Sequence, residues 1–420
     1  EQCLACKPGT FRSDARHQLE LCSTCPGGMY SFGGAAACRV CPIGGDCSDP
    51  TRILAAPGFW YPYGNASAQL DMGAFLACEP AEACPGGAGY TQCAPGYANN
   101  FACSKCSTGY ARAGEKCIEC PGDMVSVVIV IALVAVGIAV GIVVITLVVR
   151  AQRMKTQRRV RSLSVVPQIV KTAINTAQTL AVVFALRAQT SKLLATTAAQ
   201  ALTFSALSMD IVPIRCLSNL SVYQSFVATM LVPIAIVFVS GLCSLVASPT
   251  QPALAARQAA TIAAVGFFLA YPAVARSAMS MLACRAFSLR SGLWLADDLD
   301  IQCFVGSHAV YAGVAVVAIV VYVVGAPLAL LLALRAAPAD RYSRWSFFAG
   351  QYRSRVWFWE WAILIRKVGM TALAVYSRRA VEQLVMTSLV LIVVLGAQLY
   401  AQPLILRKLN NAEAGGVAVC

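Results

Sequence analysis

Apolar residues follow two contrasting patterns along this chain. In residues 1–123 they are scattered, and cysteine, glycine or proline interrupts them every few positions. From residue 124 onward they form long stretches, several of which reach the roughly 20 residues that a helix needs to cross a hydrocarbon core of about 30 Å. The pattern therefore predicts a small disulfide-rich module of short β hairpins and loops, followed by an all-α multi-span membrane bundle.

Seven apolar stretches are candidate membrane spans. The first, 124–149, contains no charged residue and is predicted to be a helix that faces lipid. The second, 168–187, is amphipathic because it contains Lys171, Asn175 and Gln178, so it either crosses the membrane or lies in its interface. The remaining five stretches are 220–247, 258–283, 307–334, 357–377 and 381–402.

These stretches divide the chain into five expected segments. An extracellular cysteine-rich module, 1–123, precedes the first span, 124–149, and a basic linker, 150–167. A bundle of about six further spans occupies 168–403, and a tail occupies 404–420. We expect the natural protein to extend beyond both ends, because the sequence begins within a cysteine pattern and shows no signal peptide.

Basic residues predict the orientation of the chain. Segment 150–161 contains six Lys and Arg residues and no acid, and segment 335–355 contains five Arg residues and one acid. Positively charged loops favour the cytoplasmic side of a membrane. Both segments and the tail are therefore predicted to be cytoplasmic, and the cysteine-rich module lies on the opposite, oxidising side.

Composition supports lipid contact. Of the 420 residues, 58% are hydrophobic and only 12% are charged, whereas soluble domains carry about 25% charged residues. The net charge of +14 would suit a nucleic-acid partner, but the basic residues cluster at the ends of apolar stretches. We therefore attribute them to membrane topology and to attraction by anionic lipid, and expect no nucleic-acid partner.

Cysteine usage predicts the chemistry of the N-terminal module. Its fourteen cysteines are even in number and include five C-x-x-C pairs, which in a cytosolic chain would indicate zinc. The predicted oxidising compartment favours disulfides instead. Cys284 and Cys303 bracket a later loop on the same side and could also pair. The predicted disulfide cysteines are Cys3, Cys6, Cys22, Cys25, Cys38, Cys41, Cys47, Cys78, Cys84, Cys93, Cys103, Cys106, Cys117, Cys120, Cys284 and Cys303.

A short motif recurs around these cysteines. A turn containing glycine follows the cysteine, often with an aromatic residue after it, as in Cys6-Lys-Pro-Gly-Thr-Phe and Cys25-Pro-Gly-Gly-Met-Tyr. Glycine supplies a positive φ, and the aromatic ring packs on the disulfide. The motifs resemble ephrin-receptor-like and TNF-receptor-like cysteine-rich repeats, and residues 56–106 resemble an EGF-like domain. The resemblance, which covers 1–120, implies a surface module that binds an extracellular protein or glycan.

Two further features belong to the predicted outer side. Asn65-Ala-Ser67 and Asn219-Leu-Ser221 are sequons, so N-glycans are expected on Asn65 and Asn219. An aromatic cluster in the cysteine-rich module is either a binding patch or the small core of a cysteine-poor segment, and we favour the core. The cluster consists of Phe59, Trp60, Tyr61 and Tyr63.

One candidate span carries charges. Glu360, Arg366 and Lys367 lie within 357–377, where an ionisable side chain is costly and marks a functional site by default. Glu360 and Lys367 are seven residues apart and so share a helical face. Three interpretations remain open: a polar interior, a structural ion pair that locks two helices, or side chains that snorkel to the interface.

The chain offers little for catalysis or metal binding. Its two histidines, His17 and His308, lie far apart in the sequence, and it contains no Walker loop or Gly-x-Ser-x-Gly elbow. We expect no enzyme activity, catalytic residue or cofactor. Asp297, Asp298 and Asp300 could bind calcium, although three acids in a short loop are more often simply solvated.

A second resemblance covers roughly 164–413. Several short motifs occur in an order similar to that of the TRP-like transmembrane region that follows cysteine-rich ectodomains in protist and algal surface proteins, and more distantly to polycystin-like proteins. The resemblance implies a channel-type bundle. The motifs are Leu295-Ala-Asp-Asp-Leu-Asp-Ile301-Gln-Cys303, His308, Phe347, Tyr352, Trp359-Glu360-Trp361, Arg366-Lys367, Gln383, Pro403, Leu409-Asn410 and Glu413.

Three functional hypotheses follow from the sequence. The first is a cell-surface protein whose ectodomain binds or tethers extracellular material and is coupled to a TRP-like channel-type bundle. The second is a passive anchor or adhesion protein for an extracellular or ciliary-surface structure, and the third is a seven-span receptor. All three hypotheses place the chain in the plasma membrane or the ciliary membrane. They are compatible with an oligomer and with a subunit of a larger complex.

Overall fold

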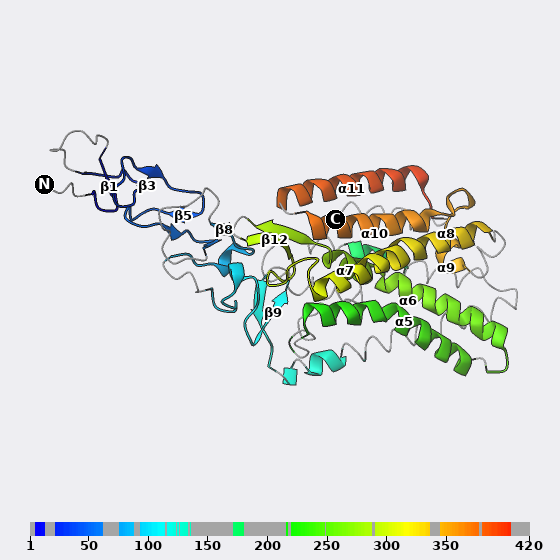
Figure 1. Ribbon diagram of the computed structural model, residues 1–420. Helices are drawn as coiled ribbons and strands as arrows, with labels where there is room; N and C mark the ends of the chain where they lie inside the picture. Colours follow the sequence, from blue (N-terminus) through cyan, green and yellow to red (C-terminus); the bar gives the residue numbers. More distant parts are fainter. Residues whose placement is uncertain are drawn as a thin grey trace. The chain divides into compact units, whose positions relative to one another are not determined.

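The chain forms two compact units, Glu1–Cys120 with Cys284–Cys303, and Pro121–Ala283 with Phe304–Cys420. We call them the disulfide unit and the helical unit (Figure 1). The computed structural model describes residues 5–12, 22–61, 75–87, 93–113, 116–122, 124–125, 127–132, 135, 171–179, 216, 220–247, 249–287, 290–336, 345–377 and 380–404. The expected fold class, a disulfide-rich module of short hairpins plus a helical membrane region, is confirmed.

The disulfide unit is a succession of two-stranded antiparallel hairpins, which follow one another in chain order (Figure 1). Short strands are expected where glycine and proline recur every few residues. Two single 3₁₀ turns, η1 (Ala81–Ala83) and η2 (Phe101–Cys103), lie between the later hairpins. The strand pairs are β1 (Thr10–Phe11) with β2 (Ser23–Thr24), β3 (Met29–Tyr30) with β4 (Arg39–Val40), β5 (Gly45–Asp46) with β6 (Leu54–Ala55), β7 (Phe59–Trp60) with β8 (Leu76–Ala77), and β9 (Tyr110–Ala113) with β10 (Lys116–Glu119).

Disulfides hold these hairpins in strict chain order. Each bond closes one loop before the next loop begins, and the two cysteines of a C-x-x-C pair belong to different bonds. Cys120 and Cys216 are also disulfide-bonded, whereas Cys3 lies outside the described residues. The successive bonds along the unit are Cys6–Cys22, Cys25–Cys38, Cys41–Cys47, Cys78–Cys84, Cys93–Cys103 and Cys106–Cys117.

The recurring glycine turn has the backbone conformation that the motif predicts. The glycine three residues after a cysteine has a φ between +79° and +91° at Gly9, Gly28, Gly44, Gly96 and Gly109. Residues with a side chain rarely adopt this region, so the turn requires glycine. The repeated motif therefore forms a tight turn that reverses the direction of the chain beside a disulfide.

Small apolar clusters complete the disulfide unit. In one of them Ile53 and Phe75 are buried, and Phe59 and Tyr61 pack against them. Trp60 packs against a second cluster that contains Cys78 and Cys84. The aromatic segment therefore forms core rather than an exposed patch over its described part; Tyr63 and Asn65 lie outside the described residues.

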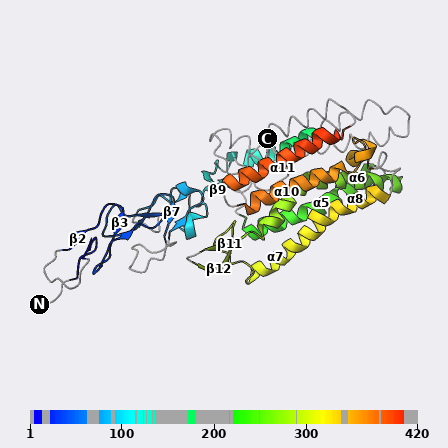
Figure 2. The ribbon, with the colours of Figure 1, turned by 90° about the horizontal axis from the view of Figure 1, so that it is seen from above.

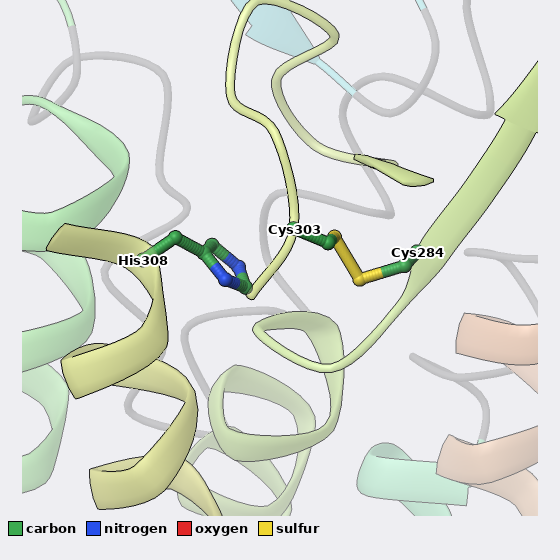
Figure 3. A group of neighbouring side chains, drawn as sticks. All are labelled: Cys284, Cys303 and His308. Atoms are coloured by element: carbon green, nitrogen blue, oxygen red, sulfur yellow. A yellow bond between two sulfur atoms is a disulfide. The ribbon is translucent and has the colours of Figure 1, made fainter. Parts of the chain in front are cut away.

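A hairpin from the later half of the chain completes this unit. Strands β11 (Cys284–Phe287) and β12 (Arg290–Leu295) pair antiparallel with a bulge at Ala286/Phe287, and Cys284 is bonded to Cys303 (Figure 3). We call Cys284–Cys303 the inserted hairpin. The division expected from the sequence placed these residues with the bundle, 168–403, whereas they belong to the disulfide unit.

The helical unit consists of long helices that run alongside one another (Figures 1 and 2). Helix α6 contacts both α5 and α10, and α10 contacts α11. Residues 171–179 are also helical, as are 124–125, 127–132 and 135. The labelled elements are α5 (Val222–Ala247), α6 (Pro252–Ser280), α7 (Ser307–Ala318), the π-helical η3 (Ile319–Gly325), α8 (Ala326–Ala336), α9 (Ser346–Ala349), the 3₁₀ turn η5 (Ser354–Val356), α10 (Trp359–Tyr376) and α11 (Ala380–Ala401).

Within the part of the chain that the structure describes, four helical segments are long and apolar enough to cross a membrane: Val222–Val246, Pro252–Ser280, Ser307–Ala336 and Val381–Ala401. They match four of the seven predicted spans. Their outward side chains are strongly exposed, with Phe238 73%, Val320 61% and Val393 70% accessible. Such apolar surface requires lipid contact, so the chain is a membrane protein. Helix α10 forms within the predicted span 357–377, but its charged residues make it less apolar.

Helix α6 is fastened to an irregular turn between α7 and α8. Pro327 has no N–H, so it cannot bond to the carbonyl of Val323 four residues earlier. The hydroxyl of Tyr271 on α6 donates to that carbonyl oxygen at 2.8 Å. Within the hydrocarbon region an unbonded backbone carbonyl is costly. The tyrosine therefore stabilises the proline site and links the two spans.

Candidate functional site: a buried charged cluster

Helix α10 directs its charged side chains into the helical unit. Glu360 is 1% exposed, Arg366 7% and Lys367 5%. The spacing of six and seven residues places all three within one half of the helix surface. Apolar Ile365 on another side of α10 is 49% exposed. The charged side chains of the helix therefore lie on its inner face, together with apolar Ile363, Leu364 and Met370.

Glu360 is bound by two partners from other parts of the unit. The ammonium of Lys171, in helical segment 171–179, forms an ion pair with Oε2 of Glu360. The hydroxyl of Tyr352, which precedes α10, donates to the same oxygen at 2.9 Å. Lys171 is itself only 1% exposed. The carboxylate thus joins segment 171–179 to α10 by a buried ion pair.

Aromatic rings surround the two lysines. The ammonium of Lys367 lies 3.7 Å from the ring centroid of Phe268 on α6, and that of Lys171 lies 5.5 Å from the same centroid. Lys171 is also 5.5 Å from the rings of Phe348 and Tyr352. The face of an aromatic ring attracts a cation, more strongly when water is absent. Phe268 therefore supports both ammonium groups.

Nζ of Lys367 and Oε1 of Glu360 are among the buried polar atoms that have no hydrogen-bond partner among the described residues. Burying a charge without a hydrogen bond is costly. The space that adjoins Glu360 between α8 and α10 amounts to about 10 Å³, which is room for roughly one water molecule. Lys367 and Glu360 therefore each retain a polar atom that could bind a new partner.

The structure decides between the interpretations of Glu360, Arg366 and Lys367. All three face the interior, so none snorkels to the surface of the unit. Glu360 is paired with Lys171 and not with Lys367. The ion pair that joins two helices is therefore present, and it leaves Lys367 in a polar interior.

Sequence reasoning missed Lys171, Tyr352 and Phe268 as members of the site. A signal for Lys171 existed, because Lys171, Asn175 and Gln178 recur at helical spacing. These three side chains are 1%, 3% and 2% exposed, and the Gln178 side chain donates to the carbonyl of Leu269 at 3.3 Å. The polar face of this segment packs into the unit instead of facing water, as it would in an interfacial helix.

In the disulfide unit, charges hold the inserted hairpin. Arg285 pairs with Glu79 at 2.6 Å, and Lys105 lies 3.0 Å from Asp298 and 2.8 Å from Asp300. Burial lowers the pKa of Lys105, but its hydrogen bonds to the two aspartates raise it more, so the pKa lies above its ordinary value. These aspartates were the calcium candidates together with Asp297. Calcium stays a prediction, and it would have to displace this lysine.

Aromatic contacts reinforce the inserted hairpin. The guanidinium of Arg290 lies 4.1 Å from the ring centroid of Phe101 and 4.7 Å from that of Trp294, and donates to the carbonyl of Leu299 at 3.1 Å. Leu299 and Phe101 are buried together, with Phe287 packed against them. The hairpin is thus part of the core of the disulfide unit.

The remaining candidate residues take structural positions where they are described. The two sulfurs of Cys284 and Cys303 are bonded to each other (Figure 3), so neither is a free thiolate for a metal ion. His308, at the start of α7, is buried and accepts the backbone N–H of Phe304 through Nδ1 at 3.0 Å. His17, Asn65 and Asn219 lie outside the described residues.

Comparison of the chain with protein-family models, with curated proteins and with solved structures finds no match. The fold and the two sets of contacts described above therefore carry the functional argument. What they define is a membrane protein with a disulfide-rich, extracellular-type module and a helical bundle that buries a charged cluster.

Proposed function

We propose that this protein is a transducer at the cell surface, whose disulfide unit binds an extracellular protein or glycan and passes that event to a channel-type bundle. The observation that carries the proposal is the inserted hairpin. Residues 284–303 complete the disulfide unit, yet in the chain they connect α6, which ends at Ser280, directly to α7, which begins at Ser307.

Chain connectivity gives the hairpin its significance. A passive anchor needs only one connection between an ectodomain and a membrane bundle, and the junction at Cys120–Pro121 provides it. Here a second connection leads from the disulfide unit into two consecutive spans. A disulfide, three ion-pair contacts and an arginine between two aromatic rings stabilise that connection. Displacement of the disulfide unit would therefore act on α6 and α7 together.

Two features of the bundle support a channel-type role. Buried charges within spans are costly and are typical of ion pathways, and here Lys171, Glu360, Arg366 and Lys367 gather in one place. The resemblance to the TRP-like transmembrane region adds to this. Gating would require a wet path to open beside this cluster, because the space that adjoins Glu360 between α8 and α10 has room for about one water molecule.

A passive anchor is the second candidate. The small volume beside Glu360 favours it, because a bundle that conducts needs a wet path in at least one state. In that case the charged cluster would serve only to lock segment 171–179 against α10. The two candidates predict different results when the inserted hairpin is loosened: a transducer changes its channel openings, and a passive anchor shows none.

Currents from the full-length protein, reconstituted in planar bilayers, test the proposal. We expect single-channel openings whose frequency changes when the inserted hairpin is loosened by the double substitution Cys284→Ser and Cys303→Ser. Cys243→Ser provides the matched control, because Cys243 is free and lies in α5. Silence of the wild-type protein in bilayers of several lipid compositions would favour the anchor, and identical openings in the double variant would reject transduction through the hairpin.

A further inference from the structure

Lys367 belongs to the charged cluster but takes no part in the ion pair between Lys171 and Glu360. Its side chain is 5% exposed, and Nζ has no hydrogen-bond partner among the described residues. Its closest stabilising contact is the ring of Phe268, 3.7 Å from the ammonium. An aromatic face attracts a cation, but it does not fix the position of the cation as a hydrogen bond would.

The surroundings of Lys367 offer it a second position. Oε1 of Glu360 is also without a hydrogen-bond partner among the described residues, while Oε2 binds Lys171 and Tyr352. Glu360 lies two helical turns before Lys367 on the same helix, and side chains on a helix incline toward its N-terminus. A change of rotamer that moves the Lys367 ammonium in this direction would bring it closer to Oε1 of Glu360.

A membrane potential acts on such a charge. The free energy of a charge within the membrane changes with the membrane potential, in proportion to the fraction of the field that the charge crosses. Glu360 and Lys171 neutralise each other at short range, so the field acts on them in opposite directions. The ammonium of Lys367 lies against the ring of Phe268 and makes no hydrogen bond among the described residues, so the field would drive a partial displacement of this charge along α10.

We propose that Lys367 is a voltage-sensing charge, which exchanges between the face of Phe268 and the free oxygen of Glu360 as the membrane potential changes. In the structure the ammonium of Lys367 lies at the ring of Phe268. The N-terminal end of α10 is predicted to be cytoplasmic, so an inside-negative potential draws the ammonium toward Glu360. The charge movement does not require conduction, but its effect on opening rests on the proposed channel function.

Charge movement in oocytes that express the full-length chain tests this inference. Under a cut-open voltage clamp we expect a saturating, nonlinear displacement current of a fraction of one elementary charge per chain. Lys367→Gln should abolish it, whereas Lys367→Arg, which keeps the charge at all accessible pH values, should retain it. Arg335→Gln is the matched control, because Arg335 is exposed at the end of α8, and it should behave as wild type.

A second variant keeps the test decisive if Lys367→Gln fails to reach the cell surface. Phe268→Leu removes the ring but keeps an apolar side chain, so the displacement current should persist with a shifted midpoint potential. Absence of nonlinear charge movement in wild type, its persistence in Lys367→Gln, or an unshifted midpoint in Phe268→Leu would each overturn the inference. Charge movement without ionic current would reject the channel and leave the voltage-sensing lysine intact.

Discussion

The two units place the same kind of ion pair in opposite environments. In the disulfide unit the side chains of Lys105 and Asp300 are 39% and 42% exposed, whereas in the helical unit those of Lys171 and Glu360 are 1% and 2% exposed. An exposed pair contributes little because water competes with it. A buried pair adds little net stability, yet breaking it is costly because one charge is left without a partner. The first pair is a weak contact between two distant parts of the sequence, and the second holds segment 171–179 and α10 in one arrangement.

The strongest test of this comparison is the removal of Glu360. Glu360→Ala leaves Lys171 buried without its counter-charge, and we expect the helical unit to lose about 3–5 kcal/mol. Thermal unfolding of the detergent-solubilised protein, followed by fluorescence-detected size exclusion, should show a lower midpoint and less monodisperse protein. Glu382→Ala on α11 is the control, because Glu382 is exposed.

A companion variant separates lost charge pairing from lost packing. Lys171→Leu combined with Glu360→Leu removes both charges, and an apolar pair of similar size often restores stability. We expect the double variant to unfold at a higher temperature than Glu360→Ala. If the double variant is as unstable as Glu360→Ala, the loss of stability comes from Tyr352 and the surrounding packing and not from the charge pair.

The disulfide unit should respond most to loss of the bond that closes the inserted hairpin. Cys284 and Cys303 are separated by 19 residues, and a disulfide that closes a loop of this size stabilises by about 3 kcal/mol. In Cys284→Ser/Cys303→Ser we expect faster amide hydrogen exchange in β11 and β12, with little change in α5. Unchanged exchange rates would show that the ion pairs and rings suffice to hold the hairpin.

Replacement of Arg290 should destabilise the inserted hairpin less than loss of its disulfide. Arg290→Ala removes two cation–π contacts and the hydrogen bond to Leu299, which together stabilise by roughly 1–2 kcal/mol in this half-buried position. Limited proteolysis should cut between β11 and β12 faster, and Arg290→Lys should lie between the variant and wild type because lysine cannot stack as guanidinium does. Arg52→Ala serves as control, because the Arg52–Asp49 pair is exposed; equal cleavage rates in both alanine variants would contradict the assignment.

The smallest expected effect is the pH dependence of Lys105. Its pKa in the folded unit is raised above the ordinary 10.5, so its contribution is fully present below pH 10.5 and is lost as the pH rises through the folded pKa. We expect hairpin stability, followed by tryptophan fluorescence, to be flat between about pH 6 and 9 and to fall at higher pH by less than ~1 kcal/mol. The same titration of Lys105→Gln should lack this decline; a decline that persists would belong to another group.

Much of the fold follows from residue patterns. Four apolar stretches became helices long enough to span a membrane, and the glycine turns have their expected φ values, because length and backbone sterics are local properties. The inserted hairpin could not be predicted, since its partners, Glu79, Phe101 and Lys105, lie more than 150 residues away in the sequence. Glu360 could be identified from the sequence as a charge in an apolar segment. Its pairing with Lys171 could not be predicted, because it depends on which helices pack together.

The chain order of the disulfides has a consequence for biosynthesis. Every bond from Cys6 to Cys117 can close as soon as its own loop has entered the oxidising compartment, yet the hairpin that covers Phe101 is synthesised about 160 residues after Cys120. At roughly 5–20 residues per second the half-finished module waits roughly ten to thirty seconds. During that interval Phe101 lacks the cover that Phe287 and Leu299 later provide, so this part of the core of the disulfide unit is exposed until the inserted hairpin has been synthesised.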